Sequence, residues 1–191
     1  GVQTCALPIY VRTEAMPQFS GEAAAEAAVE LAQQAVTTTQ HAGHPAALTE
    51  ARIRLARAHM AAERGLIARE IATQAVAEAP TDELAARALA ELGRIEMRLD
   101  DLVAAERHYR EALRRSPAML SSEVLQEFAE VLERSHTLDD AVNILHMGLD
   151  KLRTAHEGAE LLDRLRSEWM IFCRLGDIAL VRGDLAGAQR A

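Results

Sequence analysis

Small residues recur along this chain at a fixed spacing, and they constrain its fold more than any other feature. The segment AVELAQQAV at residues 28–36 returns forty positions later as AREIATQAV at residues 68–76. In each copy the alanines stand four and then three residues apart, which places them on one side of an α-helix. Offsets of 40, 37, 36 and 47 residues between successive stripes predict an all-α chain of stacked helical hairpins. The later stripes are Ala105, Tyr109 and Ala112, then Ala141, Leu145 and Gly148, and one that begins at Ala188.

The composition fits close packing of helices through small side chains. The chain is 49% hydrophobic but only 3% aromatic, and about a fifth of it is alanine, the strongest helix former. A net charge of −8 argues against nucleic acid and anionic lipid as partners. No segment approaches the roughly 20 apolar residues of a membrane span, and no signal peptide is recognisable. We therefore expect a cytoplasmic protein that binds neither nucleic acid nor membrane.

The two ends of the chain stand apart from the repeats. Residues 1–9, GVQTCALPI, match one translation of a common sequencing-library adapter, and we interpret them as an artefact. Residues 10–20 show no periodicity, so we expect an irregular segment there. If Cys5 is not native, Cys173 alone remains, which excludes an intrachain disulfide and a cysteine metal site. We expect the chain to be a fragment of a solenoid truncated at both ends.

Turn signals divide the rest of the chain into units of a single solenoid. Three β-branched threonines followed by Gly43 should end the first helix, which we expect over residues 21–39. Gly65 is the expected turn of the next hairpin, and Asp100-Asp101 that of the one after it. The predicted units are a second helix of a partial repeat at 21–45, repeats at 46–80, 81–117 and 118–154, and an incomplete repeat at 155–191.

One unit shows the repeat pattern most completely. It carries Leu92-Gly93 in its first helix, a small residue at Ala105, an aromatic residue at Tyr109 and a closing proline. This pattern resembles the tetratricopeptide repeat (TPR), which has the same types in the same order. Small residues at these positions let two helices approach closely, and a larger side chain would wedge them apart. The resemblance covers the chain from residue 21 onwards, in units longer than the family's usual length of about 34 residues.

The resemblance implies a right-handed α-solenoid of antiparallel helix hairpins whose first helices line a concave face that binds peptides or proteins. Non-core positions of the first helices are then the candidate partner-binding residues. The early units supply basic residues and the later ones acidic residues, which predicts a dipolar groove for a partner with an acidic stretch. Ordinary solvated helix faces are the alternative interpretation. The candidates are Arg54, Arg57, Arg87, Arg94, Arg98, Glu123, Glu127, Glu130 and Asp177.

Residues that could suggest catalysis or metal binding are better explained by structure. His41 and His44 have no third ligand nearby and fall in an expected exposed loop. We expect Trp169 to pack between neighbouring hairpins, and Cys173 to be a small core or groove residue. No catalytic, metal-binding or cofactor-binding residue is predicted.

The predicted function is therefore a non-catalytic protein-interaction scaffold. An alternative is a sensor or regulatory segment of a larger bacterial signalling ATPase or transcription regulator, in which a small ligand would bind the concave face. A third possibility is a catalytic domain elsewhere in a longer chain. The repeats themselves are compatible with all three.

Overall fold

The computed structural model describes residues 21–154, 161–184 and 187–188. The predictions for residues 1–9 and 10–20, and the ends of the last predicted unit, lie wholly or partly outside these residues. The described residues form α-helices joined by short turns, with one 3-10 helix and no strand. The helices are α1 Gly21–Ala42, α2 Pro45–Ala61, α3 Gly65–Ala77, α4 Asp82–Arg98, α5 Leu102–Arg115, α6 Ser122–Arg134, α7 Leu138–Thr154 and α8 Leu161–Val181, with η1 at Pro117–Met119.

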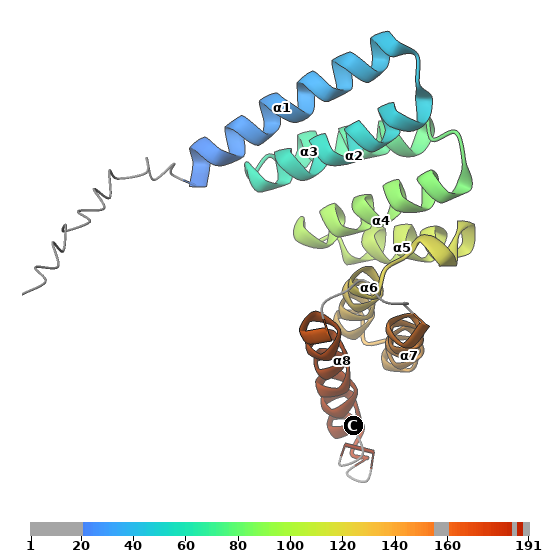
Figure 1. Ribbon diagram of the computed structural model, residues 1–191. Helices are drawn as coiled ribbons and strands as arrows, with labels where there is room; N and C mark the ends of the chain where they lie inside the picture. The colour runs from blue at the N-terminus through green and yellow to red at the C-terminus, as the bar shows by residue number, and fades with distance from the viewer. Residues whose placement is uncertain (1–20, 155–160, 185–186, 189–191) are drawn as a thin grey trace, which may run out of the picture.

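The helices stack in chain order from α1 at one end to α8 at the other (Figure 1). Each helix contacts the next along the chain, and the first helices of successive hairpins also contact one another: α2 with α4, α4 with α6, and α6 with α8. Among the described residues, the backbones of α3, α5 and α7 make no such contacts with each other. The first helices therefore lie on the inner, concave side, which we call the inner face.

The predicted stripe of small residues forms the contact between the two helices of a hairpin. Ala68, Ala72 and Ala75 of α3 are fully buried, as are Ala105 and Ala112 of α5. Because these side chains end at Cβ, the backbones of paired helices can lie close together. This confirms the hairpin packing that the repeat pattern predicts.

The stripe on α1 is different, because α1 packs against α2 on one side only. Ala28 and Ala35 are exposed, whereas their equivalents in α3 and α5 are buried. The α1–α2 contact is centred on Val36, Ala51 and Leu55, and Ala32 is the one residue of the α1 stripe that packs against them. The repeat pattern therefore predicts which side of a helix carries small residues. Whether that side is buried depends on the neighbouring helix.

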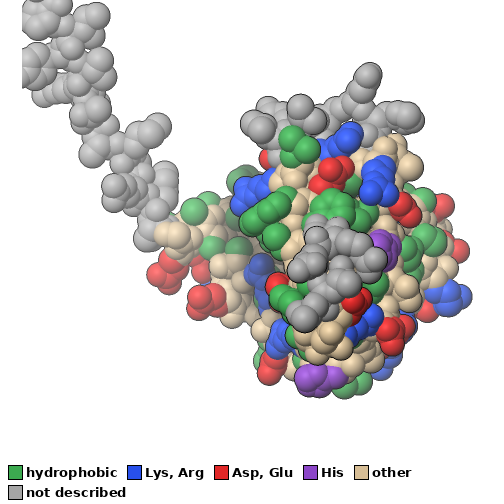
Figure 2. All heavy atoms as spheres, turned by 90° about the horizontal axis from the view of Figure 1, so that it is seen from below, with side chains coloured by type: hydrophobic (Ala, Val, Ile, Leu, Met, Phe, Trp, Pro, Cys, Tyr) green, Lys and Arg blue, Asp and Glu red, His purple; other side chains and the backbone are tan. Residues whose placement is uncertain are grey.

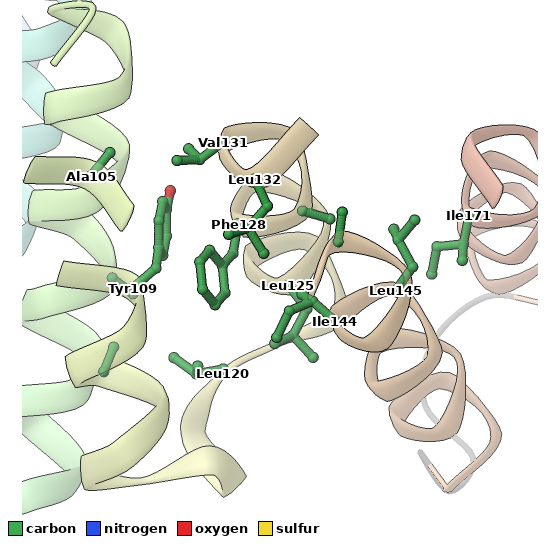
Figure 3. Close-up of a cluster of buried hydrophobic side chains, with 14 of the residues drawn as sticks. Ala105, Tyr109, Leu120, Leu125, Phe128, Val131, Leu132, Ile144, Leu145 and Ile171 are labelled. Carbon is green, nitrogen blue, oxygen red and sulfur yellow. The ribbon is translucent and has the colours of Figure 1, made fainter. Parts of the chain in front are cut away.

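Aromatic stacking joins the second hairpin to the third. The rings of Tyr109 and Phe128 stack with centroids 5.4 Å apart, and both side chains are buried (Figure 3). Leu125, Leu145 and Ile171 continue this cluster through α6 and α7 to α8. Two of the chain's few aromatic residues thus form the contact between these two hairpins.

Two details of the predicted helix boundaries are wrong. Helix α1 continues past residue 39 to Ala42. The hydroxyl groups of Thr37, Thr38 and Thr39 donate to backbone carbonyls one turn earlier, so these threonines are accommodated within the helix. Gly65 is not the turn residue but the first residue of α3, where a Cβ would lie 2.6 Å from Leu99 Cδ2.

The turn within each hairpin instead contains one residue whose backbone is in the left-handed conformation, with positive φ. Glu63, Asp100, His136 and Gly183 have φ values of 59°, 64°, 60° and 73°. In each turn the backbone N–H groups of this residue and of the next one donate to carbonyl groups of the preceding helix. These hydrogen bonds supply partners for carbonyls at the end of that helix. The four turns are therefore built alike, although only one uses glycine.

The prediction for Trp169 is also wrong. Its side chain is 63% exposed on α8 rather than packed between hairpins. The equivalent positions in the earlier first helices hold the small, buried residues Thr49, Ala86 and Ser122. An indole cannot occupy the narrow space that those residues fill, so it projects from the helix. Cys173, one turn further along, is exposed as well.

No helix in the described ranges is long and apolar enough to cross a membrane. Those ranges also contain no group of three or more His, Cys, Asp or Glu side chains that could hold a metal ion. His41 lies in the last turn of α1 rather than in a loop, where its ring contacts the Thr37 carbonyl, and His44 is exposed just before α2.

Candidate functional site

The inner face is crossed by ion pairs between consecutive first helices. From α2, Arg57 Nε donates to Glu91 Oε2 of α4 at 2.6 Å. In the opposite direction, Arg87 of α4 pairs with Glu50 of α2. Arg57 and Arg87 therefore do not form an isolated positive patch, because a carboxylate of the neighbouring helix lies beside each of them.

Arg94 links α4 to α6 and uses all three of its guanidinium nitrogens. Nε and Nη2 lie 2.9 Å from the Glu127 carboxylate, and Nη1 lies 2.9 Å from Glu91 Oε2. Burial opposes the charged form, but hydrogen bonding to Glu127 and the charges of Glu127 and Glu91 outweigh it and raise the pKa of Arg94. Arg94 is thus held in place from both sides.

The same network reaches into the core. The buried Tyr109 hydroxyl donates to Glu127 Oε2 at 3.3 Å. Burial, reinforced by the negative charge of Glu127, raises the pKa of Tyr109, so it remains a neutral donor. The inner face at Arg94 is therefore tied to the contact between the second and third hairpins.

A further link joins α6 to α8. Arg174 of α8 lies 3.4 Å from Glu130 and 3.2 Å from Glu133, and it also donates to the Gln126 carbonyl at 3.1 Å. Each neighbouring pair of first helices is thereby connected by at least one arginine–carboxylate pair.

A pocket of about 180 Å³ opens on the inner face where α2, α4, η1 and the start of α6 meet. Its apolar lining includes Ala90, Leu120 and Val124, of which Leu120 is almost fully buried. Arg57, Arg87, Arg94 and Glu91 line the same pocket, together with Met119 and Ser121. The result is a small hollow of mixed lining, in which apolar side chains lie beside three guanidinium groups and one carboxylate.

The structure brings some of the predicted site residues together and separates others. Arg57, Arg87 and Arg94 meet at the pocket, and Glu127 supports Arg94 from α6. The remaining five candidates lie elsewhere on the first helices and do not line this pocket: Arg54, Arg98, Glu123, Glu130 and Asp177.

Glu123 is nevertheless electrostatically linked to this region. A hydrogen bond from the Ser121 hydroxyl lowers the pKa of Glu123, and the nearby charge of Arg94 contributes in the same direction. Glu123 therefore remains ionised beside the pocket and would repel an anion placed over α6.

Sequence reasoning missed the acidic members of the site, Glu50 and Glu91, and the apolar lining. A usable signal exists, because the paired residues are 34, 37 and 33 positions apart in Arg57–Glu91, Arg87–Glu50 and Arg94–Glu127. These separations are close to one repeat. Opposite charges one repeat apart on first helices therefore indicate pairs across the inner face.

Other hollows on the described part of the chain are larger and lie outside the inner face. One of about 640 Å³ is lined by residues of α5 alone, from Val103 to Arg114 on the outer side. Another of about 640 Å³ lies between the start of α1 and the end of α2 and includes Glu22, Glu26 and Arg64. The α5 hollow also has three arginines, Arg107, Arg110 and Arg114, but it lies on the outer side of a single helix, whereas the α2–α4–α6 pocket lies on the inner face and joins several elements.

The end of the solenoid that carries α8 shows how the charges are distributed. In Figure 2, basic and acidic side chains are interspersed over this face and do not gather by sign, and apolar side chains lie between them. At this end of the solenoid, Arg182, directly after α8, pairs with Asp139 of α7 at 2.6 Å. Opposite charges are thus interspersed on the face that Figure 2 shows.

Comparison with known proteins places the fold. No protein-family model matches the chain, and no curated protein matches its sequence. Among solved structures, BtubC (BKLC) from P. vanneervenii matches with a TM-score of 0.64 at 20% identity, over 89% of this chain and 86% of that one. A putative kinesin light chain from Podosopora anserina with nearly identical TPR-like repeats matches with a TM-score of 0.63 at 20% identity, over 87% and 82%.

A variant of the Podosopora anserina protein gives a TM-score of 0.64 at 21% identity, over 87% of this chain and 82% of that one. At this level of identity the similarity concerns the fold. It confirms the expectation drawn from the repeat pattern: the chain forms an all-α, right-handed solenoid of TPR-like helix hairpins.

Proposed function

We propose that this chain is a non-catalytic protein-interaction module that binds an extended peptide segment of a partner protein on its inner face. The observation that carries the proposal is the pocket between α2, α4, η1 and α6, where an apolar lining and three arginines converge. Apolar burial supplies affinity, and the guanidinium groups favour a partner with an acidic stretch. These residues suit a peptide that carries both apolar and acidic side chains better than a neutral or basic peptide.

The pocket volume favours a peptide side chain over a small metabolite. Sites for drug-sized ligands usually measure about 300–1,000 Å³, whereas a cavity of about 150 Å³ holds one benzene ring. At about 180 Å³ the pocket matches a single apolar side chain. The role of small-ligand sensor in a larger regulator therefore receives no support from this site.

The test is selection of binding peptides from a random displayed library, followed by fluorescence anisotropy with purified protein. Val124→Trp should fill the pocket, because Val124 lines it and is only half-buried. Val103→Trp is the matched control, since Val103 is 82% exposed on the outer side of α5. Circular dichroism establishes that both variants are folded.

We expect selected peptides to bind wild type and Val103→Trp alike, and to lose roughly tenfold or more in affinity for Val124→Trp, as for loss of one buried anchor. Selected sequences should be enriched in acidic residues next to an apolar one. Unchanged affinity for folded Val124→Trp would show that the pocket is not the binding site.

A further inference from the structure

Within the group of arginines at the pocket, the hydrogen-bond pattern separates one residue from the other two. Arg94 engages Nε, Nη1 and Nη2 with Glu127 and Glu91, and its side chain is 23% exposed. A guanidinium group has five N–H donors in a fixed fork. With a carboxylate on each side, Arg94 has little capacity left for a ligand.

Arg57 and Arg87 are engaged at one nitrogen each. Arg57 contacts Glu91 through Nε, and Arg87 contacts Glu50 through Nη1. Within the described part of the chain, the other nitrogens of these two groups have no side-chain acceptor. Their side chains are 54% and 41% exposed at the pocket.

The carboxylates behind these arginines fix their orientation. Glu91 is 2% exposed and lies under Arg57, so the Nε edge of that guanidinium faces the protein and the terminal nitrogens are left for the pocket side. A fork held in this way can take a carboxylate with little loss of side-chain freedom.

We propose that Arg57 and Arg87 together bind one carboxylate of the ligand, directly beside the apolar side chain that enters the pocket, and that Arg94 serves only to hold the inner face together. This inference rests on the proposed function and specifies its ligand: a peptide in which an aliphatic residue is adjacent to Asp or Glu. Because the three arginines are opposed by Glu50, Glu91 and Glu127, the site suits a singly charged carboxylate more than a dianion.

The probes are three blocked dipeptides, Ac-Leu-Glu-NH2, Ac-Leu-Gln-NH2 and Ac-Ala-Glu-NH2. Binding at millimolar concentration is followed from the backbone amide shifts of Ala90, Ser121 and Val124 in two-dimensional NMR of the whole chain. The glutamine probe has the same shape without the charge, and the alanine probe keeps the charge without the anchor.

For wild type we expect Ac-Leu-Glu-NH2 to bind roughly fivefold more tightly than Ac-Leu-Gln-NH2, as for one partly exposed charged hydrogen-bond pair. Ac-Ala-Glu-NH2 should be weaker still. The preference for glutamate should shrink as salt is raised, because exposed charges are screened over about 8–10 Å near physiological ionic strength.

The variants separate the roles of the arginines. Arg57→Gln and Arg87→Gln should each abolish most of the preference for glutamate, and Arg57→Gln should lower the melting temperature less than Arg94→Gln does, because Arg94 continues to pair with Glu91. Arg94→Gln should lower the melting temperature and retain the preference. Arg98→Gln is the control, since Arg98 is exposed on α4 and does not line the pocket.

Equal binding of the glutamate and glutamine probes to wild type would overturn the inference and leave the proposed function standing, because the leucine would still occupy the pocket. A preference that survives Arg57→Gln and Arg87→Gln but disappears in folded Arg94→Gln would also overturn it. If neither leucine probe shifts the pocket amides, this ligand assignment is wrong, and the library selection with Val124→Trp decides the proposed function independently.

Discussion

Gly93 of α4 lies directly against the ring of Tyr109 in α5: a Cβ at residue 93 would be 3.0 Å from both Cδ2 and Cε2 of that ring. The ring cannot easily move away, because it is fully buried and stacked on Phe128. The glycine of the Leu-Gly pair is therefore required by contact between helices. Its backbone conformation is ordinary helix.

Gly93→Ala should destabilise the chain by about 1–2 kcal/mol. Overpacking of a buried contact typically costs about 1–3 kcal/mol, and the better helix propensity of alanine returns roughly 0.5–1 kcal/mol. Urea unfolding followed by circular dichroism measures the difference. Gly21→Ala is the control, because a Cβ there meets nothing within 4 Å. Equal stability of Gly93→Ala and wild type would contradict the packing argument.

Ala105→Leu should cost about 1–3 kcal/mol for a related reason. Ala105 is fully buried in the stripe of α5 that faces α4, so a longer side chain would push the hairpin apart. Thermal melting provides the measurement. Val103→Leu, at an 82% exposed position of the same helix, should leave the melt unchanged. A wild-type melt for Ala105→Leu would mean that α4 and α5 are not in close contact there.

Tyr109 should make stability depend on pH at alkaline values. Its pKa is raised in the folded state, first by burial and then by Glu127, so above about pH 10 the unfolded chain loses this proton while the folded chain retains it. Unfolding then releases a proton, and stability falls as pH rises. Comparison of urea unfolding at about pH 8 and about pH 11 should show a smaller decline for Tyr109→Phe than for wild type.

At neutral pH the same substitution removes one hydrogen bond to Glu127, and we expect it to cost about 1 kcal/mol. The effect stays modest because Arg94 continues to satisfy the carboxylate. An alkaline decline identical in Tyr109→Phe and wild type would show that another group causes it.

Trp169 should report an aqueous environment. It is the only tryptophan of the chain, and its side chain is 63% exposed. We expect emission close to that of free tryptophan and efficient quenching by acrylamide, with Trp169→Phe abolishing the signal. Blue-shifted emission that resists quenching in dilute solution would indicate that this part of α8 is covered.

The architecture could be predicted from local rules. A spacing of four and three residues defines one helix side, and the turn residues divide the chain into hairpins, so Ala68, Ala105 and Ala141 were all correctly placed in the core. The failures occurred where a neighbour decides the outcome. Whether Ala28 is buried depends on a helix that would have to cover α1, and whether a bulky side chain fits at Trp169 depends on the width of the contact, which sequence periodicity does not report.

The candidate site could be predicted in part. Assignment of Arg57, Arg87 and Arg94 to the first helices followed from the hairpin boundaries, and their convergence on one pocket agrees with that assignment. Their pairing with carboxylates did not follow, because it depends on how far each helix is rotated about its axis relative to the next. The short η1 segment, which supplies Met119 and leads directly into Leu120, has no counterpart in the other repeats, so this wall of the pocket is not predictable from periodicity.

The ion pairs along the inner face also have a mechanical meaning. They join α2 to α4, α4 to α6 and α6 to α8 in series, each across one repeat. We expect a superhelix held in this way to resist changes of curvature. Ion pairs link the first helices along its inner face, and the packing of the two helices in each hairpin makes every repeat rigid. Because salt screens exposed charges, we expect the pitch and radius of curvature of the superhelix to depend on ionic strength, and we expect a molecule bound along the inner face to fix both.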